Sequence, residues 1–376
     1  MRAICSPIVR QGQWLRKLAY GVDLVNAPAP TITPGQALIE VRAAAVNRAD
    51  ALQLHGDYPP PPGVTEVPGL EVAGYIMSAE SSIHQPEPDA LVQAFQTHRP
   101  VLALVAGGGL ADMCTASIPL ILPFPASGNA LRYQPDLVDP SRLTLRRTTI
   151  GEMEANAALV ESCATSWLNL KILGGLQPGQ TILIHGGSGG VGSIAVQLAS
   201  YLGARVFTTA GSPERAAACL TLGAYAGIDY HDDVNAAIAD YTRGEGVDMI
   251  LDVTGAGGLD ANLDMLATGG TLLVMGLQRG VKGTLNLSKL MEKRATITGA
   301  TLRGASPDLR ARVIADLQNY VWPLIEEGQV LPVVDTVYHA ENCGDAFARL
   351  APKWFGEPAG DYPDPKPFGK MIVTFD

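Results

Sequence analysis

The apolar positions along this chain follow strand-like and helix-like periods in turn. In residues 37–43 apolar and polar side chains alternate, as in a strand that buries one face. In residues 181–185 the apolar side chains are continuous, as in a short strand buried in a parallel sheet. A glycine loop follows, and residues 194–202 then carry apolar side chains at a helical spacing. The pattern therefore predicts an α/β protein.

The first third of the chain has the pattern of an antiparallel β domain with little helix. Short apolar runs predict strands at residues 2–9, 37–43, 68–74, 101–106 and 111–116. We expect the last two of these strands to be neighbours, joined by a tight turn at Gly107–Gly109. Four prolines at residues 59–62 predict an extended loop.

Residues 119–150 interrupt this pattern with several prolines, mixed charge and no sustained period. A loop of this length is typical of a lid, an oligomer contact or a disordered insert. We expect a surface insert and leave the three roles open.

The second half of the chain alternates short apolar runs with longer helical ones. Strands are predicted at residues 205–209, 226–230, 247–252, 271–275 and 295–299, and helices at residues 152–173, 306–327 and 339–350. A closing strand is predicted at residues 371–375. The strand at residues 181–185 and the five between residues 205 and 299 make six, and six strands with intervening helices describe a doubly wound parallel sheet.

Composition narrows the class of protein. The 376 residues are enough for two domains, and they carry a formal net charge of −10. An acidic chain argues against a nucleic-acid partner or an anionic membrane surface, and no apolar run has the length of a membrane span. The five cysteines are far apart, which suits a reducing compartment and excludes a local C-x-x-C motif. Without a recognisable signal peptide, we expect a soluble cytoplasmic protein.

The glycine loop at residues 186–192 predicts a dinucleotide site. Gly187, Gly189 and Gly192 satisfy the pattern G-x-G-x-x-G between a predicted strand and a predicted helix. Glycines at these positions permit a tight turn and close approach of the backbone to a pyrophosphate. The first turn of the helix adds free N–H groups and the positive end of its dipole.

The end of the next predicted strand indicates which dinucleotide is bound. An NAD site places Asp or Glu about twenty residues beyond the glycine loop, where it binds the ribose 2′-hydroxyl. Here that place is occupied by Ala210, Gly211 and Ser212, with Arg215 soon after. A hydroxyl and a guanidinium without a carboxylate suit a 2′-phosphate, so we expect NADPH rather than NADH. The plain alternative for Arg215 is a solvated charge on the first turn of a helix.

Taken together, these segments resemble the zinc-independent medium-chain dehydrogenase/reductases, and most closely the NADPH:quinone oxidoreductases among them. The resemblance rests on IHGGSGGVG (184–192), TTAGSPER (208–215), Asp229-Tyr230, DMILDVTG (248–255), Val46–Asp50, the loop at residues 56–60 and residues 369–373. It spans nearly the whole chain in order, but it fails at residues 78–100, 119–150 and 354–367.

The resemblance implies a split architecture. A mainly antiparallel GroES-like catalytic domain would consist of residues 1–160 and 303–376, with a Rossmann NADP-binding domain at residues 161–302 inserted between them. The active cleft would lie at the carboxyl ends of the parallel strands.

The resemblance also implies the site residues. Those expected to bind NADPH are Asn47, Thr165, Gly187, Ser188, Gly189, Gly190, Val191, Gly211, Ser212, Arg215, Tyr230, Gly255, Gly276, Leu277, Leu302 and Lys370. Tyr58 is expected near the substrate carbonyl, where the Tyr58 hydroxyl, Asn47 or backbone N–H groups would donate to the developing oxyanion. The plain alternatives are that Asn47 caps a turn, Thr165 bonds within its helix and Lys370 is a solvated charge.

The residues at the usual zinc positions predict a metal-free enzyme. Zinc-dependent relatives need a cysteine ligand after the second strand, where this chain has Asn47–Asp50, and a histidine where it has Leu70, between Gly69 and Glu71. Without a Lewis acid, alcohol oxidation is a poor fit. Hydride addition to a quinone or an α,β-unsaturated carbonyl needs mainly orientation and an oxyanion donor, so we expect one of these substrates.

Two other functions stay open from the sequence. An enoyl-thioester reductase of fatty-acid or polyketide assembly would need a basic rim for its carrier, and the candidates are Arg132, Arg142, Arg146 and Arg147. An NADPH-binding structural or sensor protein would share the glycine loop without turnover. The resemblance further implies a homodimer, formed through the strands at residues 271–300.

Overall fold

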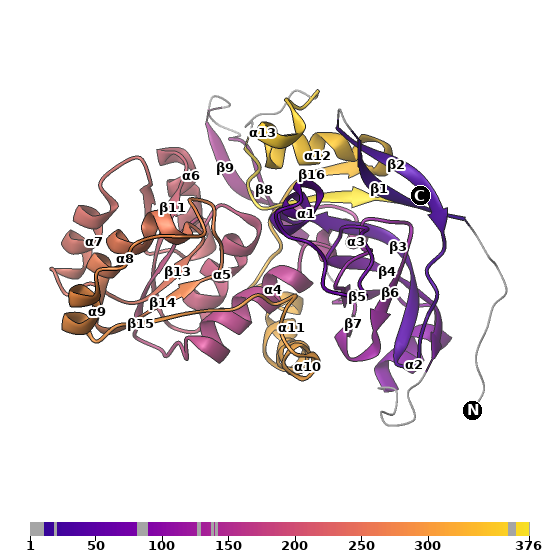
Figure 1. Ribbon diagram of the computed structural model, residues 1–376, viewed down its shortest axis with the longest axis horizontal. Coiled ribbons are helices and arrows are strands. Elements are labelled where there is room, and N and C mark those ends of the chain that lie inside the picture. The colour runs from indigo at the N-terminus through magenta and orange to yellow at the C-terminus, as the bar shows by residue number, and fades with distance from the viewer. Residues whose placement is uncertain are drawn as a thin grey trace. The chain divides into compact units, whose positions relative to one another are not determined.

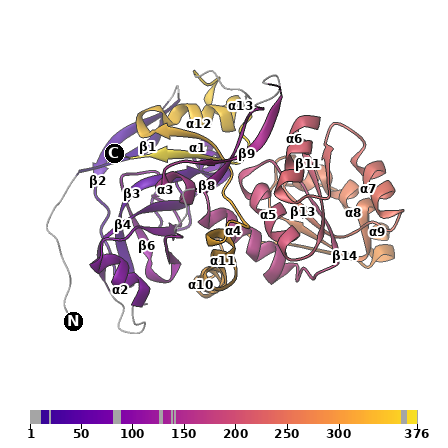
Figure 2. The ribbon, with the colours of Figure 1, turned by 180° about the vertical axis from the view of Figure 1, so that it is seen from behind.

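The computed structural model describes residues 11–18, 21–80, 89–125, 129–136, 139, 142–359 and 366–375. The chain forms two compact units. The first comprises Met1–Leu131, Arg147–Glu161 and Pro307–Asp376, and the second Arg132–Arg146 and Ser162–Ser306. Figures 1 and 2 show their elements from opposite sides. The strand predicted at residues 2–9 lies outside the described residues.

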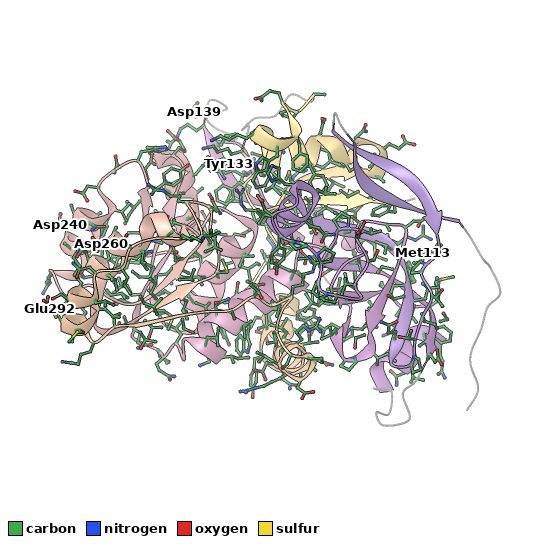
Figure 3. All side chains as sticks on the ribbon, in the orientation of Figure 1. Met113, Tyr133, Asp139, Asp240, Asp260 and Glu292 are labelled. Carbon is green, nitrogen blue, oxygen red and sulfur yellow. The ribbon has the colours of Figure 1, made fainter. Side chains whose placement is uncertain are left out.

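The first unit is organised around a seven-stranded sheet. Its strands are β3 (Gln36–Val46), β4 (Glu71–Glu80), β5 (Val101–Leu104), β6 (Met113–Ser117), β7 (Ile121–Pro123), β16 (Val334–His339) and β17 (Lys370–Thr374). The order is β16-β17-β3-β4-β5-β7, with β6 paired to β3 and Met113 at the start of β6 (Figure 3). Only the β16–β17 pair among these is parallel, so the sheet is mainly antiparallel as predicted.

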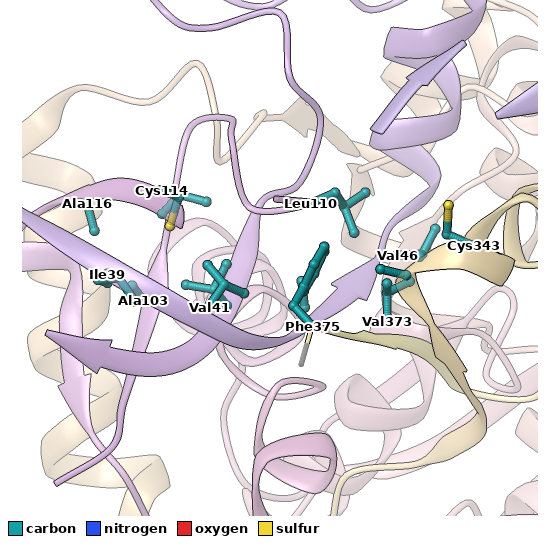
Figure 4. Close-up of a cluster of buried hydrophobic side chains, with 14 of the residues drawn as sticks. Ile39, Val41, Val46, Ala103, Leu110, Cys114, Ala116, Cys343, Val373 and Phe375 are labelled. Carbon is teal, nitrogen blue, oxygen red and sulfur yellow. The ribbon is translucent and has the colours of Figure 1, made fainter. Parts of the chain in front are cut away.

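The core of the first unit joins segments that are far apart in the sequence. From Gln36 to Ala43 half-buried and buried residues alternate along β3, which confirms the predicted half-buried strand, and the residues that follow to Val46 are all buried. Its inward side chains Ile39 and Val41 pack in one cluster with Val373 and Phe375 at the end of the chain (Figure 4). A separate antiparallel ribbon is formed by β1 (Gln11–Leu18) and β2 (Gly21–Pro28).

The helices of the first unit are short. They are α1 (Arg48–His55), α2 (Asp89–Gln96), α3 (Glu152–Asn156), α10 (Pro307–Asp316), α11 (Trp322–Glu326), α12 (Cys343–Leu350) and α13 (Pro352–Phe355). A π-helical segment at Leu317–Val321 joins α10 to α11, which confirms the helical stretch predicted at residues 306–327. Helix α1 was not expected from the sequence.

The prediction that residues 101–106 and 111–116 form neighbouring strands is wrong. Strand β5 pairs with β4 and β7, whereas β6 pairs with β3. The glycines between them serve a different purpose, because Gly109 N donates to Gly69 O at 3.1 Å and a Cβ on Gly69 would lie 2.6 Å from Gly109 Cα. The glycine run therefore permits close backbone contact with residues 67–69 instead of forming a hairpin turn.

The second unit contains a six-stranded parallel sheet. Its strands are β10 (Thr181–Ile184), β11 (Arg205–Ala210), β12 (Ala226–Asp229), β13 (Val247–Asp252), β14 (Leu266–Val274) and β15 (Thr296–Gly299). The strand order is β12-β11-β10-β13-β14-β15, and all neighbouring strands are parallel. The chain first extends the sheet from β10 through β11 to β12, and the order then reverses, with β13, β14 and β15 added on the other side of β10. This order confirms the predicted doubly wound fold. The reversal places a switch point at the carboxyl end of β10, where the glycine loop begins.

Helices connect these strands. They are α4 (Val160–Trp167), α5 (Gly190–Tyr201), α6 (Pro213–Ala218), α7 (Val234–Thr242), α8 (Leu259–Met265) and α9 (Leu287–Lys293). The single helix predicted at residues 152–173 is interrupted, because α3 ends at Asn156 and a π-helical segment at Leu168–Leu173 follows α4. Among the described residues, no helix has both the length and the apolar character needed to cross a membrane.

Part of the region expected to be an irregular insert is a β-ribbon. Strand β8 (Asn129–Pro135) pairs with β9 (Leu143–Thr149) in a two-stranded sheet. The side chains of Leu131, Tyr133 and Leu145 are buried, so alternate residues of β8 point inward. The proline and charge content hid this alternation from the sequence analysis.

Candidate dinucleotide site and a buried ionic cluster

The glycine loop lies between β10 and α5 in the second unit, as the sequence predicts. A Cβ on Gly187 would overlap the Thr208 hydroxyl of β11, and a Cβ on Gly192 would overlap the Gly186 carbonyl oxygen. A Cβ on Gly189 would meet only that same oxygen, at 3.3 Å. Gly187 and Gly192 are thus required for packing within the unit, whereas Gly189 lies on the open side of the loop.

The start of α5 offers backbone donors to an anion. Its N-cap is Gly189, which has no side chain to cap the helix, and the helix continues for twelve residues from Gly190. The first N–H groups, which include those of Gly190 and Val191, have no acceptor within the helix. Together with the helix dipole they form a site that suits a pyrophosphate.

The end of β11 brings together the residues predicted to recognise a 2′-phosphate. Ser212 is the N-cap of α6, and its hydroxyl oxygen accepts from Arg215 N at 3.3 Å. A Cβ on Gly211 would lie 3.1 Å from the hydroxyl of Tyr230, which follows the neighbouring strand β12. The Ser212 O–H and the Tyr230 O–H therefore remain close to the same strand end, and no carboxylate belongs to residues 210–212.

Arg215 does not lie in solvent. It is 6% exposed, and its Nη2 donates to Ser188 Oγ of the glycine loop at 3.2 Å. Its Cζ also lies 5.7 Å from the ring centroid of Tyr133 on β8. The plain alternative of a solvated charge on the first turn of α6 is therefore wrong, because the guanidinium reaches back to the loop.

Three of the residues expected to bind NADPH, Gly255, Gly276 and Leu277, lie just after the carboxyl ends of β13 and β14. A Cβ on Gly255 would lie 2.9 Å from Leu277 Cα, and Gly276 N donates to Asp252 O at 3.1 Å. Leu277 is 52% exposed. Leu302 is buried. These contacts join Gly255, Gly276 and Leu277, but none of them involves Leu302.

Two features of this side escaped the sequence analysis. The buried carboxylate of Asp252 accepts from Thr254 N at 3.0 Å, Thr254 Oγ1 at 2.6 Å and Gly255 N at 2.8 Å, which fixes the turn after β13. In α4, Ser166 Oγ donates to Val191 O at 3.4 Å, which brings the helix that carries buried Thr165 onto the glycine loop.

In the first unit, the two predicted oxyanion donors lie at opposite ends of α1. Asn47 is the N-cap of the helix and Tyr58 follows its last turn. Eight helical residues span about 12 Å, so the two positions are well separated. Asp50, in the first turn, accepts from Asn47 N and from Gly69 N, both at 2.7 Å. Asp50 thereby fixes the start of α1 against the segment that carries Leu70.

Lys370 is the centre of a buried ionic cluster. Its ammonium group donates to Glu71 Oε1 at 2.7 Å, to Glu161 Oε2 at 3.1 Å and to Asn47 Oδ1. Asn47 Nδ2 donates to the same Glu71 oxygen at 3.1 Å, and Glu71 Oε2 accepts from Glu161 N at 2.9 Å. We call Asn47, Glu71, Glu161 and Lys370 the lysine cluster. The alternative of a solvated Lys370 is wrong, since this residue is 4% exposed.

Burial and pairing act in opposite directions on these charges. Burial by itself lowers the pKa of Lys370, but the carboxylates of Glu71 and Glu161 outweigh it and raise that pKa above its usual range. Burial also raises the pKa of Glu71, against the attraction of Lys370. Burial raises the pKa of Asp50 to about 7, although two backbone N–H groups favour its ionised form. Lys370 is therefore a fixed cation beside Glu71, a carboxyl group whose acidity is reduced by burial.

The sequence predicts a metal-free enzyme from Asn47, which belongs to the lysine cluster, and from Leu70. Neither Asn47 nor buried Leu70 offers a thiolate or an imidazole. Within the described ranges, no group of three or more His, Cys, Asp and Glu side chains is arranged to hold a metal ion. Sequence reasoning identified Asn47 and Lys370 but not their partner Glu161, which has no motif of its own.

Two family descriptions match the chain. Residues 33–126 match the alcohol dehydrogenase GroES-like domain, and residues 190–319 match the zinc-binding dehydrogenase domain. The first lies in the sheet of the first unit, and the second covers the glycine-loop helix and the strands after it.

Curated relatives are similar over most of the chain. Prostaglandin reductase-3 of Bos taurus is 26% identical over 92% of this chain and 88% of its own length. Quinone oxidoreductase of Mus musculus is 27% identical over 88% and 91%. A phenolphthiocerol/phthiocerol polyketide synthase of Mycobacterium tuberculosis is 28% identical over 84% of this chain, but the match spans only 13% of that protein.

Solved structures share the fold. An alcohol dehydrogenase superfamily protein from Novosphingobium aromaticivorans covers 98% of this chain and 100% of its own, with a TM-score of 0.75 and 23% identity. Escherichia coli quinone oxidoreductase, solved with NADPH, covers 97% and 100%, with a TM-score of 0.71 and 21% identity. With both domain matches and the glycine-loop geometry in place, the chain is an oxidoreductase of the medium-chain dehydrogenase/reductase family.

Proposed function

We propose that this protein is a zinc-independent, NADPH-dependent reductase that transfers hydride to quinones or α,β-unsaturated carbonyl compounds. The observation that carries the proposal is the strand end at residues 210–212, which has no carboxylate and is flanked by a buried arginine and a tyrosine hydroxyl. The domain boundaries at residues 160 and 302 and the sixteen cofactor residues named from the sequence form part of this proposal.

The second unit fits NADPH in two places. The backbone donors at the start of α5 suit the pyrophosphate. The Ser212 hydroxyl, the Tyr230 hydroxyl and the Arg215 guanidinium suit the 2′-phosphate, since all three donate hydrogen bonds and none repels an anion. Two of the structures with a similar fold were solved with NADPH, which supports NADPH as the cofactor of this chain.

The first unit supports a reaction without zinc. NADPH, when bound, supplies the hydride, so the chain has to orient the acceptor and stabilise the negative charge that develops on its oxygen. The Asn47 amide donates to Glu71 and accepts from Lys370, so we assign the contact with the oxyanion to the hydroxyl of Tyr58. In this proposal Lys370 and Asn47 provide polar groups whose positions are fixed by Glu71 and Glu161.

The acceptor class follows from this chemistry and from the names of relatives. A quinone or an enone is already electron-poor, so it needs orientation and one hydrogen-bond donor more than it needs a Lewis acid. Relatives named quinone oxidoreductase and prostaglandin reductase support the two acceptor types.

A second candidate is an enoyl-thioester reductase. The similarity to a segment of a polyketide synthase favours it, and Arg132, Arg142 and Arg146 on or beside the β8–β9 ribbon would supply the basic rim. An NADPH-binding protein without turnover is the remaining alternative.

We also propose a cytoplasmic homodimer formed through β15. This strand ends the six-stranded sheet, and the exposed apolar side chains of Leu287 and Met291 on α9 lie nearby in the sequence. A second copy pairing with β15 would cover the strand edge.

The test of the cofactor assignment is a binding titration of the purified chain with NADPH and with NADH. We expect tighter binding of NADPH, and we expect Arg215→Ala to weaken NADPH binding about 10- to 150-fold, because a hydrogen bond to a charged group contributes about 1.5–3 kcal/mol. NADH binding should change little. Equal affinity of the unaltered chain for both dinucleotides would overturn the assignment.

A further inference from the structure

We propose that Tyr133, on the β8–β9 ribbon, is a specificity-determining residue for the cofactor, because its ring positions the Arg215 guanidinium that receives the 2′-phosphate. The inference rests on the proposed function, since it concerns the same NADPH site. It adds a residue from a segment in which the sequence analysis found no family feature.

Arg215 contacts both the glycine loop and the β8–β9 ribbon within the second unit. Ser188 Oγ of the loop accepts from its Nη2 at 3.2 Å, and the Tyr133 ring centroid lies 5.7 Å from its Cζ. Arg215, Ser188 and Tyr133 are 6%, 6% and 8% exposed. A long side chain that would otherwise sample many rotamers is therefore confined before any ligand arrives.

An aromatic ring is a suitable partner for this purpose. A cation within about 6 Å of a ring centroid is attracted by the ring's quadrupole, more strongly where water is excluded. Contact with the ring uses none of the five guanidinium N–H donors, whereas a carboxylate in the same place would compete with the phosphate for them. Tyr133 can thus orient the arginine without reducing its capacity to bind phosphate oxygens.

The ribbon that carries Tyr133 is outside both family matches, which cover residues 33–126 and 190–319. Tyr133, labelled in Figure 3, lies on β8, in the part of the ribbon that belongs to the second unit, as Arg215 does. Tyr133 and the buried Leu131 both point inward from β8, and Leu131 N donates to Pro332 O at 2.8 Å. This hydrogen bond therefore holds one end of the ribbon in place. Through Tyr133, the ribbon contributes to cofactor selectivity.

The experiment compares two probes that differ in the 2′-phosphate, adenosine 2′,5′-bisphosphate and 5′-AMP, by calorimetric titration of the full chain. The variants are Tyr133→Leu, Tyr133→Met as a second replacement of comparable bulk, Tyr133→Phe, and Tyr133→Leu combined with Arg215→Ala. We expect loss of the ring to weaken bisphosphate binding about 3- to 30-fold and to leave 5′-AMP binding unchanged. Tyr133→Phe keeps the ring and should retain the affinity. In the Arg215→Ala background, Tyr133→Leu should have no further effect.

Each other result points to a different error. If Tyr133→Leu and Tyr133→Met weaken the binding of both probes equally, the ring only supports the local fold. If bisphosphate binding is unchanged, Tyr133 does not belong to the site. Either result overturns this inference alone, provided the unaltered chain prefers the bisphosphate. If the unaltered chain binds both probes equally, the proposed NADPH preference fails, and the inference fails with it.

Discussion

Replacement of Lys370 by Met tests whether the lysine cluster is an ion pair that the fold depends on. Lys370 is 4% exposed in its side chain, Glu71 0% and Glu161 13%, so the change removes the cation and leaves one fully buried carboxylate and one that is partly hydrated. Loss of one partner from a buried pair typically costs about 3–5 kcal/mol. Because water still reaches Glu161, we expect a loss of unfolding free energy near the lower end, about 3 kcal/mol at pH 8.

The pH dependence of this loss identifies its cause. In Lys370→Met the pKa of Glu71 is raised further in the folded state, since burial persists and the attraction of the ammonium group is gone. A group whose folded pKa is raised contributes stability at low pH and loses it as pH rises through that pKa. The deficit should therefore be small at pH 5 and grow towards pH 8.

The assay is urea denaturation followed by circular dichroism at several pH values. Lys289→Met is the matched control, because Lys289 pairs with Asp260 and Asp264 at the surface and should lose much less. Glu71→Gln added to Lys370→Met should recover part of the lost stability. A deficit of less than about 1 kcal/mol, independent of pH, would refute the account of the cluster.

Three further substitutions test features outside the lysine cluster. For Asp50→Asn, we expect the stability of the unaltered chain relative to the variant to fall as pH rises from 4 to 7. The reason is that the pKa of Asp50 is raised to about 7 in the folded state, so that the folded chain holds the protonated carboxyl at acid pH. Parallel stability curves for the two proteins in that range would contradict the burial argument. For Gly192→Ala, we expect a lower thermal midpoint and weaker NADPH binding, because the new Cβ overlaps the Gly186 carbonyl. Gly189→Ala should keep the thermal midpoint and weaken only cofactor binding, and equal thermal midpoints for these two variants would contradict the assigned division of roles.

The second unit was largely predictable because its signals are local. A buried strand, a glycine loop and a helix follow one another within residues 181–202, and each has its own apolar period or steric requirement. The strand predicted at residues 247–252 agrees with β13 at both ends. His185, which directly follows β10, is buried, and its Nε2 lies 2.8 Å from Asn262 Oδ1.

Long-range pairings could not be predicted. The assignment of β5 and β6 as neighbours failed because adjacency in sequence does not determine pairing, and β3 has hydrogen-bonding edges for both β4 and β6. The lysine cluster joins residues separated by up to 323 positions, from Asn47 to Lys370. Tyr133 was missed for a related reason, since its strand lies among prolines and charges and its contact with Arg215 depends on the tertiary fold.

The most direct test of the proposed activity is a steady-state assay that follows oxidation of NADPH, and separately of NADH, with a para-quinone, a short enone and an enoyl thioester. We predict turnover with the quinone or the enone that prefers NADPH and that is retained after dialysis against a zinc chelator. Turnover with the thioester alone would show that the protein is an enoyl-thioester reductase instead. Binding of NADPH without turnover on any acceptor would contradict the proposed reductase function.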